Sequence, residues 1–212
     1  MNRKFTLIEL LLVIAIIGIL SSMLMPSLAN ARLKAMSSVC ISNQRQVSIA
    51  TQSYAMDNDE FGPTDNIDDH DHRWHQMLTS TYLPAGHLDK GASPVQACPN
   101  GLPLDAAWKS TIAMNSRITG KKQHGGETIQ RSIAIASPSE TCLLMDSYDA
   151  WRSTGNYNMN LKRLVTDGEP YVIARHLGKA NMSYLDGSTK PKSVSFLLST
   201  SDWNCVFWDP QQ

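Results

Sequence analysis

The sequence predicts an α+β protein in which a long N-terminal helix, transmembrane in its first half, packs on a small antiparallel β-sheet. Three observations lead to this fold class. The stretch from Leu10 to Leu28 has no charged residue and is long enough to cross a bilayer as a helix. Apolar residues then continue at helical spacing as far as Tyr54. After Gly62 the apolar runs become short and turn-forming residues become frequent, as in sheet-rich domains.

The charges beside the apolar stretch predict its orientation. Arg3 and Lys4 precede it, and basic residues flanking a membrane helix tend to stay in the cytoplasm. We therefore expect a single-pass inner-membrane protein with a cytoplasmic N-terminus and an extracytoplasmic domain. A plain signal anchor would show the same pattern. A cleaved secretory signal is a further alternative, because the small residues at 27–29 could form a cleavage site.

The helix is expected to continue beyond the membrane as an amphipathic segment over residues 29–58. Its apolar residues recur every three or four positions, and Arg32, Lys34, Gln44 and Arg45 lie off this stripe. A helix from Leu7 to Tyr54 would be roughly 70 Å long. The predicted buried stripe consists of Ala29, Leu33, Met36, Cys40, Val47, Ala50 and Tyr54, with a gap at Asn43.

Residues 59–212 are expected to form one globular domain, since together with the exposed helix about 180 residues are available to bury a core. Short apolar runs separated by turn residues predict its strands. A hairpin is expected at Leu177-Gly178-Lys179, and Asp186-Gly187 is expected to form a turn. The predicted strands are 132–136, 141–145, 171–174, 181–185 and 194–198.

The charge balance argues against nucleic-acid binding, and the cysteine content leaves the disulfide pairing open. Lys plus Arg and Asp plus Glu are each 19, so the chain lacks the basic excess of a nucleic-acid-binding protein. The four cysteines form no Cys-x-x-Cys pair, and their spacing leaves three disulfide pairings open. They could also be small buried residues. We expect a disulfide between Cys40 and Cys98 that fastens the exposed helix to the following loop.

An acidic segment with histidines is a metal candidate in the sequence. Its imidazoles and carboxylates suit several divalent ions, and with Asn58 and Asn66 its carboxylates could hold calcium. However, their spacing matches no defined site, and such loops are usually solvated. We therefore expect no metal and no cofactor. The segment contains Asp65, Asp68, Asp69, His70, Asp71, His72 and His75.

The N-terminal residues Lys4-Phe5-Thr6-Leu7-Ile8-Glu9-Leu10 resemble the prepilin cleavage and methylation motif of type IV pilins and type II secretion pseudopilins. The resemblance implies a leader of residues 1–4, cleavage between Lys4 and Phe5, N-methylation of Phe5 and a transmembrane helix over 5–28. It also implies that Glu9 pairs with the N-terminal amine of a neighbouring subunit, and that Pro26 kinks the helix. The motif usually has Gly before the cut, where this chain has Lys4.

The C-terminal part resembles a pilin-like group with a His-x9-Asp-Gly signature, here His176, Asp186 and Gly187. His176 and Asp186 could suggest acid–base catalysis, but no nucleophile lies at a recognisable spacing from them. We expect a structural role, with His176 bonding the opposite turn and Asp186-Gly187 forming that turn. Further segments that match the group are Cys40–Gln44, Tyr54–Asp59, Cys98-Pro99, Met114-Asn115, Pro138-Ser139 and Leu143–Ser147.

Together these resemblances imply a structural subunit of a type IV pilus or pseudopilus and no enzymatic activity. Its expected partners are a prepilin peptidase/methyltransferase, other pilin or pseudopilin subunits and the inner membrane, in a periplasmic or surface filament. The alternative is a membrane-tethered module, for example one that binds polysaccharide and never polymerises. A platform for sugar rings could come from Trp74, Trp108, Trp151, Trp203 and Trp208, although core or subunit contacts explain them equally well.

Overall fold

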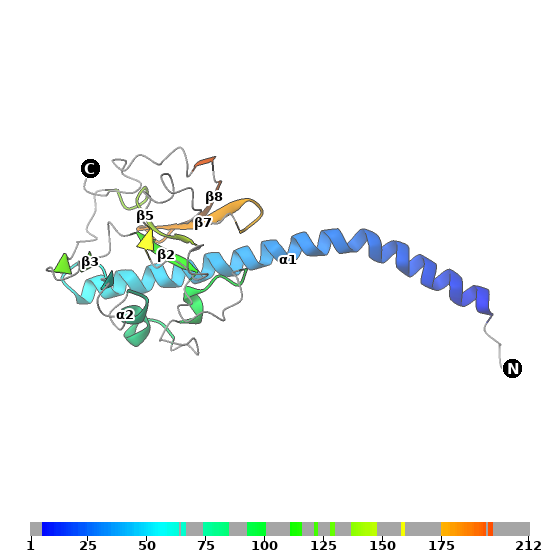
Figure 1. The fold of residues 1–212 in the computed structure, drawn as a ribbon, viewed down its shortest axis with the longest axis horizontal. Helices are drawn as coiled ribbons and strands as arrows, with labels where there is room; N and C mark the ends of the chain where they lie inside the picture. The colour runs from blue at the N-terminus through cyan, green and yellow to red at the C-terminus, as the bar shows by residue number, and fades with distance from the viewer. Residues whose placement is uncertain are drawn as a thin grey trace.

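The computed structural model describes residues 6–63, 65–66, 74–84, 93–100, 111–115, 121–122, 128–129, 137–147, 158–159, 175–193 and 195–196. One long helix, α1 (Leu7–Asp57), passes beside a small β-sheet and extends far beyond it (Figure 1). The α+β fold class predicted from the sequence is confirmed. The expected strands at 132–136 and 171–174 lie outside the described residues.

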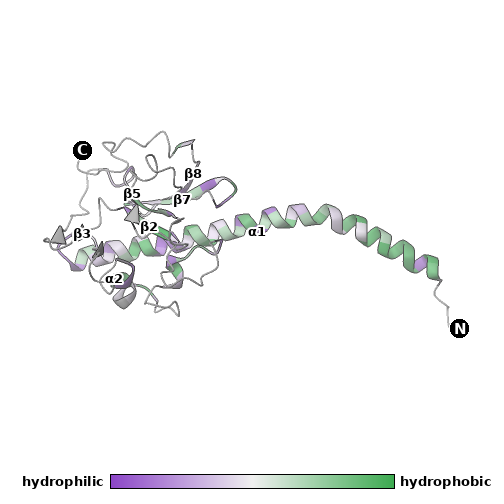
Figure 2. Cartoon of the chain, viewed as in Figure 1, coloured by the Kyte–Doolittle hydropathy of each residue, from purple (hydrophilic) through white to green (hydrophobic). Residues whose placement is uncertain are grey.

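The first half of α1 is exposed and apolar on all sides. The helix has 51 residues, which corresponds to about 77 Å at 1.5 Å per residue. It contains an apolar stretch long enough to cross a membrane, none of which is buried by the rest of the protein. Figure 2 shows this half as almost continuously hydrophobic. Pro26 lies inside the helix, and Figure 1 shows a bend in the exposed portion, as a proline commonly causes.

The second half of α1 buries one face against the sheet, mainly against strand β7 (Lys179–Tyr184). The predicted stripe is confirmed at Cys40, Val47 and Ala50, but Ala29 is exposed, because the packed portion begins further along the helix. The prediction for Gln44 was wrong, since this side chain is fully buried. The buried face consists of Cys40, Gln44, Val47, Ser48, Ala50, Thr51 and Ala55.

The main sheet has the strand order β6-β2-β5-β7-β8. Strands β2 (Ile112–Asn115), β5 (Cys142–Asp146), β7 and β8 (Thr189–Ser193) form its antiparallel part. The short strand β6 (Asn158–Met159) pairs with β2 in parallel. Every residue of β2 and β5 is buried, so these strands are covered on both faces.

Strands β7 and β8 form a hairpin closed by the predicted Asp186-Gly187 turn. Gly187 has a φ of +81°, which glycine adopts without strain, and Asp186 Oδ1 accepts a hydrogen bond from the Ser188 N–H at 2.8 Å. The strand expected at 194–198 was misplaced, because β8 begins directly after this tight turn. Strand β8 is polar and contains Pro191, which is tolerated because β8 lies at the sheet edge.

Shorter elements complete the domain and were not predicted from the sequence. Helix α2 (Trp74–Thr81) and the 3₁₀ turn η2 (Pro94–Gln96) contact α1 on the side away from the sheet (Figure 1). A small second sheet has the order β1-β3-β4, formed by β1 (Asp65–Asn66), β3 (Lys121–Lys122) and β4 (Thr128–Ile129). The apolar core consists of Val47, Ala50, Trp74, Leu78, Leu83, Ile112, Met114, Leu143, Leu144 and Leu185.

Candidate functional site

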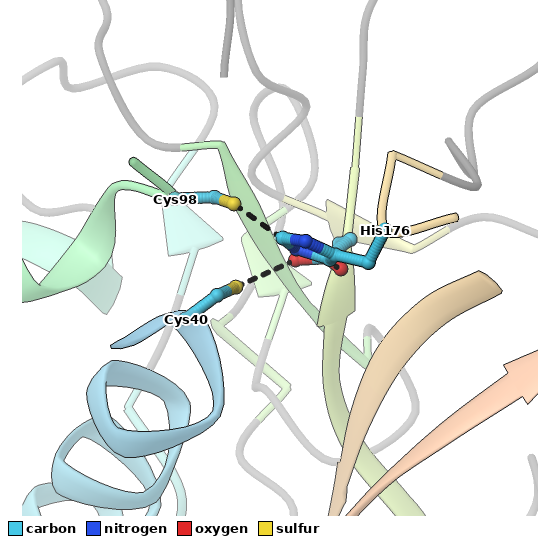
Figure 3. A group of neighbouring side chains, drawn as sticks. Cys40, Cys98 and His176 are labelled. Atoms are coloured by element: carbon cyan, nitrogen blue, oxygen red, sulfur yellow. Dashed lines mark hydrogen bonds and ion pairs between the residues drawn. The ribbon is translucent and has the colours of Figure 1, made fainter. Parts of the chain in front are cut away.

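Four side chains with metal-ligand or nucleophilic chemistry converge where α1 meets the sheet. Cys40 comes from α1, Cys98 follows η2, Asp146 ends β5, and His176 precedes β7. Figure 3 shows Cys40, Cys98 and His176 pointing into the same space. All four are buried, and their ligand atoms lie within 4.8 Å of one another. We call these four residues the Cys–Asp–His cluster.

Direct contacts link the four side chains in series, in the order Cys40, Asp146, His176 and Cys98. The Cys40 Sγ is 3.1 Å from Asp146 Oδ1, and the Cys98 Sγ is 3.2 Å from His176 Nε2. The same His176 nitrogen is 3.3 Å from Asp146 Oδ2. The Asp146 carboxylate therefore contacts both the Cys40 thiol and the His176 imidazole. The Cys98 thiol in turn contacts the imidazole.

Local turns place His176 and Cys98. His176 and Lys179 exchange backbone hydrogen bonds at 3.0 and 3.1 Å across Leu177 and Gly178. These two central residues have φ values of 52° and 77°, which is typical of a type I′ turn. The turn expected here is present, although the strand expected before it lies outside the described residues, and the turn holds His176 beside the end of β5. The Cys98 N–H donates to Thr111 Oγ1, which attaches the loop after η2 to the start of β2.

Asp146 is held by donors from both α1 and β7. Its Oδ1 accepts from Gln44 Nε2 at 3.0 Å, and its Oδ2 accepts from the Asn181 N–H at 2.8 Å. Gln44 Nε2 is also 3.2 Å from the Asn181 carbonyl oxygen, and Gln44 Oε1 accepts from Ser183 Oγ at 3.2 Å. Gln44 is buried because its amide has partners at both ends. It is a second link between helix and sheet.

The proximity of these groups shifts their protonation equilibria. A hydrogen bond from the Cys40 thiol, supported by His176 and opposed by burial, lowers the pKa of Cys98 to about 5. The same thiol contact, together with burial and the Asp146 charge, raises the pKa of Cys40. Burial opposes the charged form of His176, but its contacts with Asp146 and Cys98 outweigh burial and raise its pKa to about 9. Cys98 is therefore the more acidic of the two thiols.

This arrangement differs from a Cys–His–Asp catalytic constellation. In such a constellation the carboxylate bonds one imidazole nitrogen and the nucleophile bonds the other. Here both Cys98 and Asp146 contact Nε2 of His176. Cys98 and His176 are each only 3% exposed, so a substrate cannot reach the sulfur in this conformation. The geometry instead suits a set of ligands around one central ion, or a hydrogen-bonded cluster.

The structure bears on two expectations about these residues. Cys40 and Cys98 are brought together as predicted, but both are free thiols in the structure and no disulfide joins them. His176 does not bond the Asp186-Gly187 turn, because His176 and Asp186 lie at opposite ends of β7. It contacts Cys98 and Asp146 instead. The Asp186-Gly187 pair has the turn role that was expected.

Of the other sequence candidates that the structure describes, none belongs to the cluster. His75 is buried in α2, whereas His70 and His72 lie outside the described residues, as do Trp108, Trp151, Trp203, Trp208 and Cys205. Trp74 is fully buried in the core, so it cannot contribute to an exposed sugar platform.

Glu9 lies at the far end of α1, in the first turn. Its Oε2 accepts from the Thr6 N–H at 2.9 Å and from Thr6 Oγ1 at 2.7 Å, and the Glu9 N–H donates to Thr6 Oγ1. This is a capping box. Thr6 therefore supplies Glu9 with neutral hydrogen-bond donors at the start of its own helix. Lys4 and Phe5 lie outside the described residues.

Sequence reasoning missed Asp146 and Gln44 as site residues. Both occur in segments that match the His-x9-Asp-Gly group, which also supplies Cys40, Cys98 and His176. An acidic residue ending an otherwise apolar strand was an available signal, since a buried carboxylate requires partners. A scan against protein-family models, a search of curated proteins and a search of solved structures each found no match.

Replacing Gln44 tests whether its bonds fasten the helix to the sheet. Gln44→Leu removes the amide contacts to Asp146, Asn181 and Ser183 and leaves the buried Asp146 carboxylate with fewer partners, so we expect a loss of about 2–3 kcal/mol of stability. Gln46→Leu is the matched control, because Gln46 lies on the exposed side of the same helix. Thermal unfolding of the full chain in detergent measures both. Equal destabilisation by the two substitutions would refute the role of Gln44.

Proposed function

We propose that this chain is a structural subunit of a type IV pilus or a type II secretion pseudopilus, assembled through its N-terminal helix. The observation that carries the proposal is the division of α1 into two environments. One half is apolar and exposed on all sides, and the other half is packed against a folded domain. A filament whose core is built from such helices would bury the exposed half, and the membrane would solvate it before assembly.

Processing is the first step of the proposed function. The motif predicts that a prepilin peptidase/methyltransferase cuts between Lys4 and Phe5 and methylates the new amine. The cut would leave Thr6 and Glu9 in the mature chain, so the capping box that begins α1 would survive it. The positive charges of Arg3 and Lys4 support an N-terminus in the cytoplasm and a domain outside the inner membrane.

Glu9 is the proposed assembly residue. It is the only charged residue between Thr6 and Arg32, and a carboxylate at a lipid boundary is costly without a charge partner. The capping bonds from Thr6 supply neutral donors but no positive charge. The cationic N-terminus of an adjacent subunit would neutralise Glu9 and define the axial offset between subunits.

Intact mass of the protein extracted from membranes tests processing. We expect the mass of a chain that begins at Phe5 and carries one added methyl group. Fragmentation should assign the methyl group to the N-terminal residue. A chain that retains Met1 would contradict processing, and a chain that begins after Ala29 would indicate a cleaved secretory signal.

Glu9→Gln separates the charge of Glu9 from its capping role. Glutamine can also close a capping box, so insertion and folding should be unchanged, whereas polymer should be lost because the neighbouring amine has no anionic partner. Crosslinking and sedimentation of sheared surface material measure the polymer. Glu60→Gln, which removes an exposed charge beyond the other end of α1, should polymerise like the wild type.

Two outcomes of that comparison would count against the assembly mechanism. Equal amounts of polymer from the wild type and Glu9→Gln would show that the charge is dispensable. Absence of polymer even from the wild type would favour the membrane-tethered module.

A further inference from the structure

We propose that Cys40, Cys98, Asp146 and His176 bind a structural zinc ion that fastens helix α1 to the sheet. The proposal concerns the folded domain and does not depend on whether the chain polymerises. It rests on the convergence of four ligand-type side chains, from four separate segments, in one buried place.

The distances within the cluster suit a tetrahedral ion. At zinc bond lengths of about 2.0–2.3 Å, the edges of a tetrahedral ligand shell measure about 3.3–3.8 Å. Cys98 Sγ and His176 Nε2 are 3.2 Å apart, one Asp146 oxygen is 3.1 Å from Cys40 Sγ, and the other is 3.3 Å from His176 Nε2. With one Asp146 oxygen as the ligand, all four ligand atoms lie within 4.8 Å of one another. Adjustments of about one ångström or less in each contact would therefore place all four atoms at bonding distance from a common centre.

The ligand types favour zinc over other ions. Two sulfurs and one imidazole nitrogen are typical of zinc sites, and a carboxylate oxygen is an accepted fourth ligand. Calcium and magnesium prefer sites made only of oxygen atoms. Zinc would bind both sulfurs as thiolates and His176 through Nε2, the nitrogen that faces Cys98 and Asp146. The displaced protons would leave to solvent, and the ion would offset most of the negative charge on the two thiolates and the carboxylate.

Burial and outer contacts assign a structural role to the ion. Four protein ligands complete a tetrahedral shell, whereas catalytic zinc sites keep a position for water or substrate. Cys40 and Asp146 are fully buried, and Cys98 and His176 are each 3% exposed. The Asp146 carboxylate is already oriented by Gln44 Nε2 and the Asn181 N–H, as outer hydrogen bonds commonly orient metal ligands.

Metal content of the full chain tests the site. The untagged protein should be extracted in mild detergent without chelators, and its zinc measured by elemental mass spectrometry. We expect about one zinc ion per chain in the wild type. Cys40→Ala and Cys98→Ala should each lose the zinc. Cys142→Ala should keep it, because Cys142 is an equally buried free cysteine in β5 that does not belong to the cluster.

Cobalt substitution of the wild type provides a test that needs no variant to fold. Replacing zinc with Co²⁺ should produce the visible bands of tetrahedral cobalt and near-ultraviolet absorption from sulfur-to-cobalt charge transfer. Zinc retained in both cluster variants would overturn the proposed location. A metal-free wild type that takes up no cobalt would overturn the site itself. Peptide mapping would then distinguish a Cys40–Cys98 disulfide from a purely hydrogen-bonded cluster.

Discussion

The buried carboxylate of Asp146 is the constraint on which the packing of this protein depends. A charged group without exposure to water requires close partners, and Asp146 finds them on three separate elements. Helix α1 supplies Gln44 and Cys40, strand β7 supplies the Asn181 N–H, and the preceding turn supplies His176. These contacts define how far along the helix the sheet sits, because apolar packing alone tolerates small sliding movements whereas directed hydrogen bonds do not.

Helix α1 therefore lies in two different environments along its length. From Cys40 onward it presents a mixed polar and apolar face to the sheet, where the buried Gln44 bonds Asp146, Asn181 and Ser183. Its first half, which contains the apolar span, is not buried by the domain. A rigid junction at Asp146 would let the domain move with the helix as one body. The proposed role as a filament subunit would require such a junction.

The sequence was most informative where the physical signal is local. The apolar stretch before Leu28, the stripe through Val47 and Ala50, and the Asp186-Gly187 turn all follow from spacing or backbone preference, and the structure confirms them. Gln44 was misassigned to the exposed side, because a polar residue is buried only when distant partners satisfy it. Helical periodicity carries no information about those partners.

The candidate site was only partly predictable for the same reason. Pairing Cys40 with Cys98 was a correct expectation of proximity, but in the structure both thiols are free and share the space with two further side chains. Asp146 and His176 enter that space through strand pairing between β5 and β7. Such pairing is set by long-range packing and was not visible in the spacing of the two residues. The segments that resemble the His-x9-Asp-Gly group contain the residues of the cluster, but the resemblance did not show that their side chains lie in contact.

Hydrogen exchange of the full chain in detergent tests most directly whether Asp146 couples the helix to the sheet. Asp146→Asn keeps the size of the side chain but removes its charge and replaces one acceptor oxygen with a donor. The account predicts that deuterium uptake rises together, by a similar factor, in peptides covering residues 40–55 of α1 and residues 179–184 of β7. Faster uptake in β7 with unchanged uptake in α1 would show that the two elements are held together by other contacts.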